Sequence, residues 1–304
     1  MKMLYVAELY GAFLDSKGQI SEYDLDVIKR LQENGLIFHV ATDRSMCTLS
    51  DDCNHSSDTF GYLFDSVRPK PFNRYGHYGH FGGVMLNGAY VCDAGKCPIS
   101  MATQYAIAEV FDNYGIKGEV HGIWGDRGIP RCYTNYPVSG KNILNALDLG
   151  TMRDCVDYRE KEAAVRGGMI DNVLAFSAAG TYEELLPLKK AAAEHEDVRF
   201  TFYENSIIGK YRMCIFPRSA SQGNAVRKMK EELGCDRVVC ISDSMYDLSM
   251  FEAADVKVAM GNADDATKTV ADIIIDTNDR SGLVKFLLEE YINNDNLYPR
   301  KDIK

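Results

Sequence analysis

Short apolar runs alternate with helical stripes at both ends of the chain. The first run, residues 3–7, ends at Glu8 and passes into a turn at Gly11, which is typical of a buried strand in a parallel sheet. Apolar positions then recur at helical spacing over residues 21–34, and residues 36–41 form a second apolar run. This strand–helix–strand order predicts two parallel strands joined by a right-handed crossover.

The same rhythm returns in the last third of the chain, whereas the middle follows another. Further core strands are predicted at residues 84–86, 237–241, 256–260 and 272–275, with helices at 223–233, 246–254 and 282–291. The middle predicts helices at residues 102–114, 142–149 and 182–195 and strands at 118–124, 171–177, 198–203 and 211–216. We therefore expect a doubly wound, Rossmann-like α/β core (residues 1–93 and 218–304) with an inserted α+β cap (residues 94–217). Residues 51–83 are predicted as an extended loop.

Composition argues against some classes of binding partner and favours one cellular compartment. The chain has 304 residues, which suits two domains, and a net charge of −10, which argues against nucleic acid or an anionic membrane as a partner. The apolar runs are too short to cross a bilayer. Nine cysteines without a CxxC pair favour free thiols in a reducing cytoplasm.

Polar side chains stand where several predicted strands end. Glu8 and Tyr10 follow the first strand, Thr42 follows the second, and Asp243 and Asp247 follow the strand at residues 237–241. Ligands of open α/β sheets bind beyond the carboxyl ends of the strands. Carboxylates from two strands can share Mg²⁺, with phosphate and water completing its shell, and a threonine can donate to a phosphate oxygen. The pattern predicts a crevice for Mg²⁺ and phosphate.

Three stretches make the pattern more specific: residues 20–45, 86–92 and 238–263. The last runs from Asp243-Ser-Met-Tyr-Asp247 to Val-Ala-Met-Gly-Asn-Ala. It is similar to the GDSxND…VAMGNA pattern of the haloacid dehalogenase superfamily. Over nearly its whole length the chain resembles the Cof-type hydrolases of that superfamily, which carry a large α+β cap.

The resemblance implies a reaction and a role for each matching position. In these enzymes a first aspartate attacks phosphorus, a second acts as acid and base, a threonine and a lysine hold the phosphoryl oxygens, and an acidic motif holds Mg²⁺. The substrates implied are small phosphorylated metabolites. The nucleophile and acid/base positions correspond to Glu8 and Tyr10. The phosphate-binding positions correspond to Thr42, Asp43, Gln222 and Tyr246, and the metal positions to Glu8, Tyr10, Asp243 and Asp247.

This chain departs from the family pattern at the positions that perform the chemistry. Glu8 is longer than aspartate by one methylene, about 1.5 Å of reach. Tyr10 is a phenol, which at a reference pKa of about 10 is a poor base near neutrality. Gln222 replaces the lysine and brings no charge, while Asp43 and Tyr246 replace a glycine and an asparagine. We therefore expect phosphatase activity to be weak or lost.

Two other functions remain open from the residues. One is a non-catalytic binding or regulatory protein that uses the capped crevice; the other is an enzyme with rewired chemistry at Glu8 and Tyr10. The ring of Tyr10 could also simply fill the site. Asp243 and Asp247 also fit as helix caps, and Thr42 as a strand-end hydrogen-bonding residue.

Further residues carry weaker signals. His77 and His80 are spaced for a metal, but without nearby cysteine or carboxylate partners they favour a mobile polar loop. Trp124 and Arg127 fall in the predicted cap and could face the crevice; for Trp124, packing in the core of the cap is an equal alternative.

Overall fold

A computed structural model describes residues 1–42, 83–85, 88–91, 95–96, 98–124, 129–134, 156–157, 172–205, 210–244 and 248–293. Contacts between Cα atoms divide the described chain into two units. The first unit takes the described residues up to Thr42, those from Gly83 to Gly95, and those from Ser221 onward. The second unit takes the described residues from Lys96 to Ala220.

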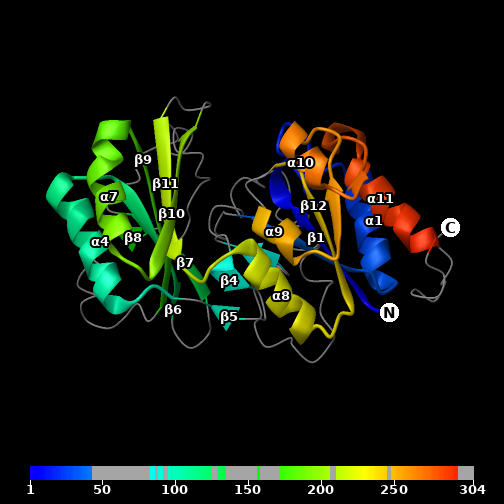
Figure 1. Cartoon of the computed structure of the whole chain (residues 1–304), viewed down its shortest axis with the longest axis horizontal. Coiled ribbons are helices and arrows are strands. Elements are labelled where there is room, and N and C mark those ends of the chain that lie inside the picture. The colour runs from blue at the N-terminus through cyan, green and yellow to red at the C-terminus, as the bar shows by residue number, and fades with distance from the viewer. Residues whose placement is uncertain are drawn as a thin grey trace. The chain divides into compact units, whose positions relative to one another are not determined.

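The first unit is built on a sheet with the strand order β14-β13-β12-β1-β2-β3-β4-β5, in which the neighbouring strands β1 and β12 are labelled in Figure 1. Its strands are β1 (Met3–Glu8), β2 (Ile37–Ala41), β3 (Gly83–Met85), β4 (Tyr90–Val91), β5 (Gly95–Lys96), β12 (Arg237–Ser242), β13 (Val256–Ala259) and β14 (Ile273–Ile274). All pairs from β14 to β3 are parallel, and β3 pairs antiparallel with β4. Segments far apart in the sequence thus form one parallel sheet, which confirms the predicted α/β fold class.

Helices cover both faces of this sheet. They are α1 (Glu22–Glu33), α8 (Gln222–Glu232), α9 (Leu248–Ala253), α10 (Asp265–Val270) and α11 (Gly282–Asn293), with a short turn, η4 (Asn278–Arg280). Helices α1 and α11 contact each other, as do α8 and α9 on the opposite face (Figure 1). The fully buried Leu4 and Val6 of β1 pack with Val226 of α8 and Met250 of α9. Burying each such side chain contributes about 1.5–3 kcal/mol.

Local signals explain where the helices begin. The Ser21 hydroxyl accepts a hydrogen bond from the Asp24 backbone amide at 3.0 Å and so caps α1. Ser221 does the same for α8 through the amide of Asn224, also at 3.0 Å. Each cap satisfies a backbone amide in the first turn of its helix that has no partner within the helix.

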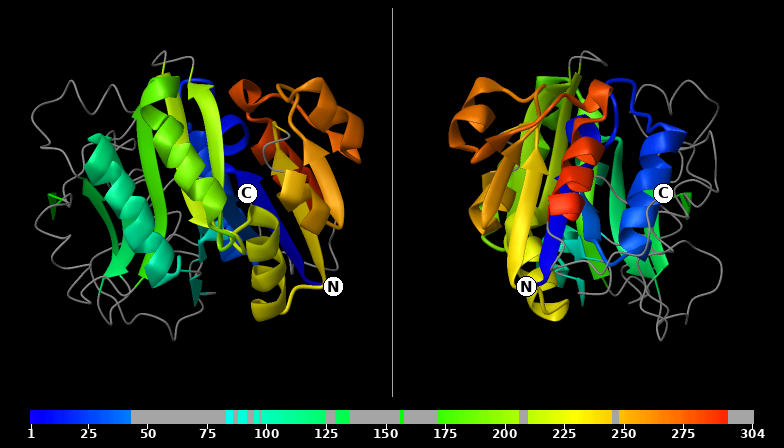
Figure 2. Two further views of the ribbon diagram at one scale, coloured as in Figure 1. Left: turned by 60° about the vertical axis from the view of Figure 1, so that its left-hand side comes forward. Right: turned by 90° about the vertical axis from the view of Figure 1, so that its right-hand side faces the viewer.

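The second unit is a sheet with the order β10-β11-β9-β6-β7-β8. Its strands are β6 (Gly118–Trp124), β7 (Ile129–Thr134), β8 (Val156–Asp157), β9 (Asn172–Gly180), β10 (Val198–Asn205) and β11 (Lys210–Pro217), and its described helices are α4 (Met101–Tyr114) and α7 (Tyr182–Glu194). All pairs are antiparallel except β7 with β8. Both helices lie on one face (Figure 2), where Val120, Phe176 and Ile215 share a core with them. This antiparallel sheet with helices fits the predicted α+β cap.

The structure contains strands that were not predicted, and some of the predicted elements lie outside the residues that it describes. Strands β7 and β8 of the second sheet were not predicted. The helix predicted at residues 142–149 lies outside the described residues, as do most of the 51–83 loop and the pair His77 and His80. Among the described helices, none is both long and apolar enough to span a membrane.

Candidate functional site

The chain leaves the central strand β1 through a wide turn, η1 (Leu9–Phe13). Within it Tyr10 has extended backbone angles and Gly11 has φ +79°. A positive φ is costly for any residue with a Cβ, so glycine is required at this position. The turn closes with a hydrogen bond from the Leu14 amide to the Leu9 carbonyl at 2.9 Å. It leaves Tyr10 half-buried at the carboxyl edge of the sheet.

The carboxylate of Asp243 lies directly against this turn. A Cβ added to Gly11 would be 2.0 Å from Asp243 Oδ2 and 2.3 Å from its Cγ. The residue before it, Ser242, ends β12, and its hydroxyl donates to Glu8 Oε2 at 3.3 Å. Because β1 and β12 are parallel neighbours, with Ala7 opposite Ile241, their last residues meet at one edge. The structure therefore brings the ends carrying Glu8 and Asp243 together.

Thr42 extends this edge on the other side of β1. It follows β2 directly, is buried, and its amide donates to the Val84 carbonyl of β3 at 2.8 Å. Glu8 lies opposite Ala41 in the register of β1 and β2. Glu8 and Thr42 therefore stand at the ends of neighbouring strands.

Gln222 is the first residue of α8 and is only 4% exposed. Its side-chain Oε1 has no hydrogen-bond partner within the described part of the chain. The helix end is held tightly: a Cβ on Gly223 would be 1.9 Å from the Ser249 carbonyl oxygen, and one on Gly88 would be 2.2 Å from that of Ser221. The amides of Gly223 and Asn224 already donate to the hydroxyls of Ser249 and Ser221, but the positive end of the helix dipole still attracts anions. Gln222 thus places a buried amide group at an anion-attracting end.

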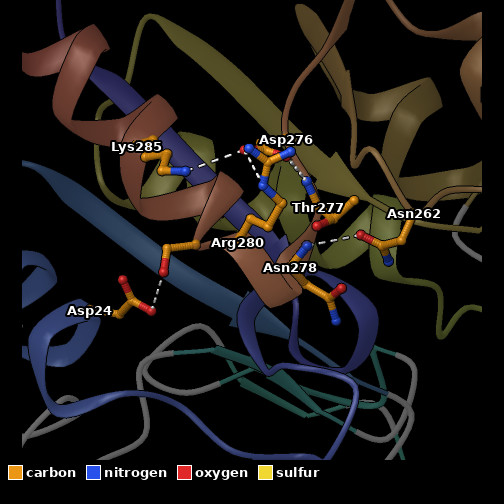
Figure 3. Close-up of polar contacts among 8 residues, drawn as sticks. Asp24, Asn262, Asp276, Thr277, Asn278, Arg280 and Lys285 are labelled. Atoms are coloured by element: carbon orange, nitrogen blue, oxygen red, sulfur yellow. Dashed lines mark hydrogen bonds and ion pairs between the residues drawn. The ribbon is translucent and has the colours of Figure 1, made fainter.

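The turn after β1 is tied to the C-terminal part of the first unit by asparagine hydrogen bonds, of which Figure 3 shows the one between Asn262 and Asn278. Asn262 Nδ2 donates to the Gly11 carbonyl at 2.8 Å, and its Oδ1 accepts from the Asn278 amide at 3.0 Å. Asn278 Nδ2 in turn donates to the Leu14 carbonyl at 2.9 Å. Sequence reasoning did not assign Ser242, Asn262 or Asn278 a role. Ser242 had only the signal of lying next to Asp243, Asn262 only that of lying inside the Gly-Asn-Ala turn, and Asn278 had none.

Asp276 anchors the same segment (Figure 3). Its carboxylate accepts from the Thr277 amide at 2.9 Å and from Lys285 Nζ at 3.2 Å, and it pairs with Arg280 Nε at 3.4 Å. The Thr277 hydrogen bond first, and then the two cations, hold the pKa of the Asp276 carboxyl below its usual 3.8. The ionised form is therefore favoured in the folded state.

We predict that Asp276 contributes to stability only above acidic pH. Its folded-state pKa lies below the unfolded value, so its contribution is complete above 3.8 and is lost as the pH falls through the lower folded value. Asp276→Asn keeps an acceptor for Thr277 and removes the charge. Urea unfolding at about pH 7 and about pH 3 should show a gap between the two proteins that shrinks at the acidic pH. An equal gap at both pH values would contradict the prediction.

The acidic residues that the structure describes at this edge supply the type of ligand atom that a divalent cation prefers. Glu8 and Asp243 supply carboxylate oxygens, which Mg²⁺ prefers, from two neighbouring strands. Among the described residues, no group of three or more His, Cys, Asp or Glu side chains could hold a metal ion. The predicted residues Asp43, Tyr246, Asp247 and Arg127 lie outside the described part, and Trp124 is the last residue of β6.

Comparisons with known proteins place this geometry in context. A family model described as haloacid dehalogenase-like hydrolase matches residues 6–61 and 151–287. Phosphoglycolate phosphatase of Sulfurisphaera tokodaii is 41% identical over 88 residues, which cover 29% of this chain and 38% of that protein. Pyridoxal phosphate phosphatase of Escherichia coli is 40% identical over 74 residues, which cover 24% of this chain and 27% of that protein. The matched stretches thus span less than half of either relative.

The whole chain is similar in fold to a solved structure. A haloacid dehalogenase-like hydrolase from Bacteroides thetaiotaomicron superposes with a TM-score of 0.69 over 95% of this chain and 100% of that chain. The sequences are 18% identical, so this likeness concerns the fold.

Proposed function

The chain belongs to the haloacid dehalogenase-like hydrolases, of the Cof type, and from this premise we propose that it binds a small phosphorylated metabolite and hydrolyses it weakly or not at all. One observation carries the proposal. The carboxylate of Asp243 lies against Gly11, and Glu8 ends the neighbouring strand, while the chain supplies a tyrosine and a glutamine where hydrolysis needs a carboxylate and a lysine. The site keeps its scaffold and lacks two of its reactive groups.

Binding would use the groups that remain. Thr42 can donate to a phosphate oxygen through its hydroxyl, Gln222 can donate through its side-chain amide nitrogen, and the dipole of α8 favours an anion at this end. Mg²⁺ bound by Glu8 and Asp243 would offset the negative charge of the phosphate. The relatives named for phosphoglycolate and pyridoxal phosphate support a small monoester as the ligand.

We expect the rate of hydrolysis to be lowered at three connected steps: nucleophilic attack, proton transfer and stabilisation of the phosphoryl charge. The Glu8 carboxylate lies 3.3 Å from the Ser242 hydroxyl and carries one methylene too many for the family geometry. Misplacing a reacting atom by about 1 Å can cost about 10²-fold in rate. Tyr10 is a poor base near neutrality. Gln222 stands where the family has a lysine, so the negative charge of the phosphoryl oxygens lacks a neighbouring cation.

The compartment follows from the thiols. Cys214, Cys235 and Cys240 are buried, and no two of the nine cysteines in the sequence have CxxC spacing, which favours free thiols. Free thiols suit a reducing environment, so the proposal places the protein in the cytoplasm.

The test measures binding and turnover separately. We expect calorimetry with Mg²⁺ to detect binding of at least one ester among phosphoglycolate, pyridoxal phosphate and hexose phosphates. Phosphate release should stay below about 1 s⁻¹, the low end of ordinary enzyme turnover. Asp243→Asn, which removes a charge without changing size, should weaken binding.

Each outcome decides one part of the proposal. Binding without any turnover assigns the non-catalytic alternative, a ligand-binding protein. Turnover near the enzyme median of about 10 s⁻¹ would show that hydrolysis is intact and the second half of the proposal wrong. If no ester binds, the first half is wrong.

A further inference from the structure

The sheet of the second unit ends on one side in a long strand. β10 has 8 residues and, in the described part of the chain, pairs with β11 alone. The other strands at the edges of the two described sheets, β5, β8 and β14, have 2 residues each. A short edge strand offers little backbone to another chain, whereas a long one is a template for pairing. Of the described edges, β10 therefore offers the most backbone to a partner strand.

The backbone of β10 directs alternate residues to this outer edge. The Arg218 amide donates to the Asp197 carbonyl at 2.7 Å, just before the ladder of β10 and β11 begins. Hydrogen-bonded pairs alternate along an antiparallel ladder, so every second residue from Asp197 onward bonds to β11. The residues between them include Phe200, Phe202 and Glu204. Their amide and carbonyl groups consequently point outward, where no described strand meets them.

Little charge protects the outer edge. Natural edge strands are commonly blunted by lysine, proline or a charge that points into the edge. From Val198 to Tyr203 the sequence has one charged residue, Arg199. Its guanidinium donates to the Ala220 carbonyl and lies 5.6 Å from the centre of the Phe216 ring of β11. Arg199 thus turns toward β11, and this part of the edge presents no charge to an approaching strand.

Aromatic side chains lie along the same edge, on the face of the sheet that carries the helices. The rings of Phe202 and Tyr211 stack with centroids 5.1 Å apart, and Tyr182 meets each of them edge-on at 5.5 Å. Tyr182 is 40% exposed, and Phe200, Phe202 and Tyr211 are half-buried. Aromatic residues are enriched at the centres of protein interfaces, where they contribute much of the binding energy.

A second copy of β10 fits this edge in an antiparallel arrangement centred on Thr201. Such a pair has a two-fold axis perpendicular to the sheet, so Thr201 of one copy faces Thr201 of the other. Phe200 of each copy then lies opposite Phe202 of the other. Because both phenylalanines direct their backbone groups outward, these opposed residues exchange hydrogen bonds. Aromatic pairs and paired threonines are among the cross-strand pairs that stabilise antiparallel sheets.

The charges at the two ends of β10 suit the same arrangement. Glu196 and Arg218 are exposed at its start, and Glu204 and Lys210 are exposed at its end. In an antiparallel pair the start of one strand lies beside the end of the other. Each end of the interface therefore brings together two negative and two positive side chains, which favours this pairing over one between like charges.

We propose that β10 forms the interface of a homodimer, in which two copies of the chain join the sheets of their second units edge to edge. A second copy is favoured over an unrelated strand because the same segment supplies both members of the aromatic, threonine and charged pairs. The proposal concerns assembly and does not depend on the proposed phosphate chemistry.

The test measures self-association of the full chain. Sedimentation velocity between about 1 and 100 µM should show a reversible dimer with a Kd in that range. Thr201→Lys places two cations opposite each other at the two-fold axis, and Thr201→Asp places two anions there. Each variant alone should dimerise at least about tenfold more weakly, because like charges in an interface are costly. An equimolar mixture of the two variants should regain the affinity of the unmodified chain, since lysine then faces aspartate.

A matched control and a second variant separate pairing from folding. Thr269 is exposed on α10 in the first unit, and its changes to lysine and aspartate should leave the Kd unchanged. Glu204→Pro removes an outward amide hydrogen without removing a bond to β11, so it should weaken the dimer even if the Thr201 variants do not fold.

Three results would overturn the proposal. The first is an unmodified chain that stays monomeric at about 100 µM, which would leave the edge to a strand of a different protein. The second is a dimer that the Thr201 and Glu204 variants do not weaken, which would place its interface elsewhere. The third is a mixture of the two Thr201 variants that associates no more strongly than either variant alone.

Discussion

The triple variant Glu8→Asp, Tyr10→Asp, Gln222→Lys is expected to release phosphate from small phosphate esters at least about 10²-fold faster than the unmodified chain. This is the largest gain of function that the proposal implies. It requires no change to the strands, because all three positions lie at the carboxyl edge of the first sheet or at the start of α8.

Each substitution supplies a missing group to a surface that is otherwise in place. Aspartate at position 8 shortens the nucleophile by one methylene and takes its oxygens away from Ser242. Aspartate at position 10 places a carboxylate on a half-buried turn, and positioned acids and bases contribute about 10²–10⁴-fold. Lysine at position 222 replaces an amide whose Oε1 has no described partner with a cation for the phosphoryl oxygens.

The measurement is phosphate release with Mg²⁺, for the unmodified chain, each single variant and the triple variant. Groups that act in one reaction are not additive, so the single variants should each gain far less than the triple variant. The matched control adds Asp243→Asn to the triple variant and should remove the gain. A triple variant that folds and binds an ester yet stays as slow as the unmodified chain would contradict our account of these positions.

Much of the first unit could be predicted because its signals are local. The apolar run of β1 and the apolar stripe of α1 each lie within a dozen residues, so the periodicity of the sequence was enough to predict both elements. The convergence of Glu8 and Asp243 could also be predicted, since parallel strands share a carboxyl edge.

The contacts that shape the site could not be predicted, because they join residues distant in sequence. Asn262 reaches the Gly11 carbonyl across 251 positions, and Ser242 reaches Glu8 across 234. No pattern in one sequence specifies such a pair. The same holds for the second unit, where the position of β10 at the edge of the sheet becomes visible only once the strands are paired.

Gly11→Ala is expected to displace the Asp243 carboxylate and lower the free energy of unfolding by about 2–4 kcal/mol. Two costs add. A Cβ at φ +79° is strained, and it would lie 2.0 Å from Oδ2, 2.3 Å from Cγ and 2.6 Å from Oδ1 of Asp243. The whole carboxylate must swing away, so ester binding that depends on Mg²⁺ should be lost as well.

Gly18 offers a matched control, because it separates strain from contact. Its φ is +72°, and a Cβ there would meet nothing within 4 Å. Gly18→Ala should therefore cost only the strain, about 1–2 kcal/mol, and leave ester binding intact. Urea unfolding and calorimetry of the two variants measure both effects.

A double-mutant cycle then tests whether the part of the Gly11→Ala destabilisation that exceeds the strain comes from the clash with Asp243. In an Asp243→Ala background the clash is absent, so Gly11→Ala should cost no more than Gly18→Ala does. The difference between the two backgrounds measures how firmly Asp243 is held against the turn. If Gly11→Ala costs the same with and without the carboxylate, Asp243 does not rest on Gly11 in solution. The edge on which we place the phosphate and the cation would then be assembled differently.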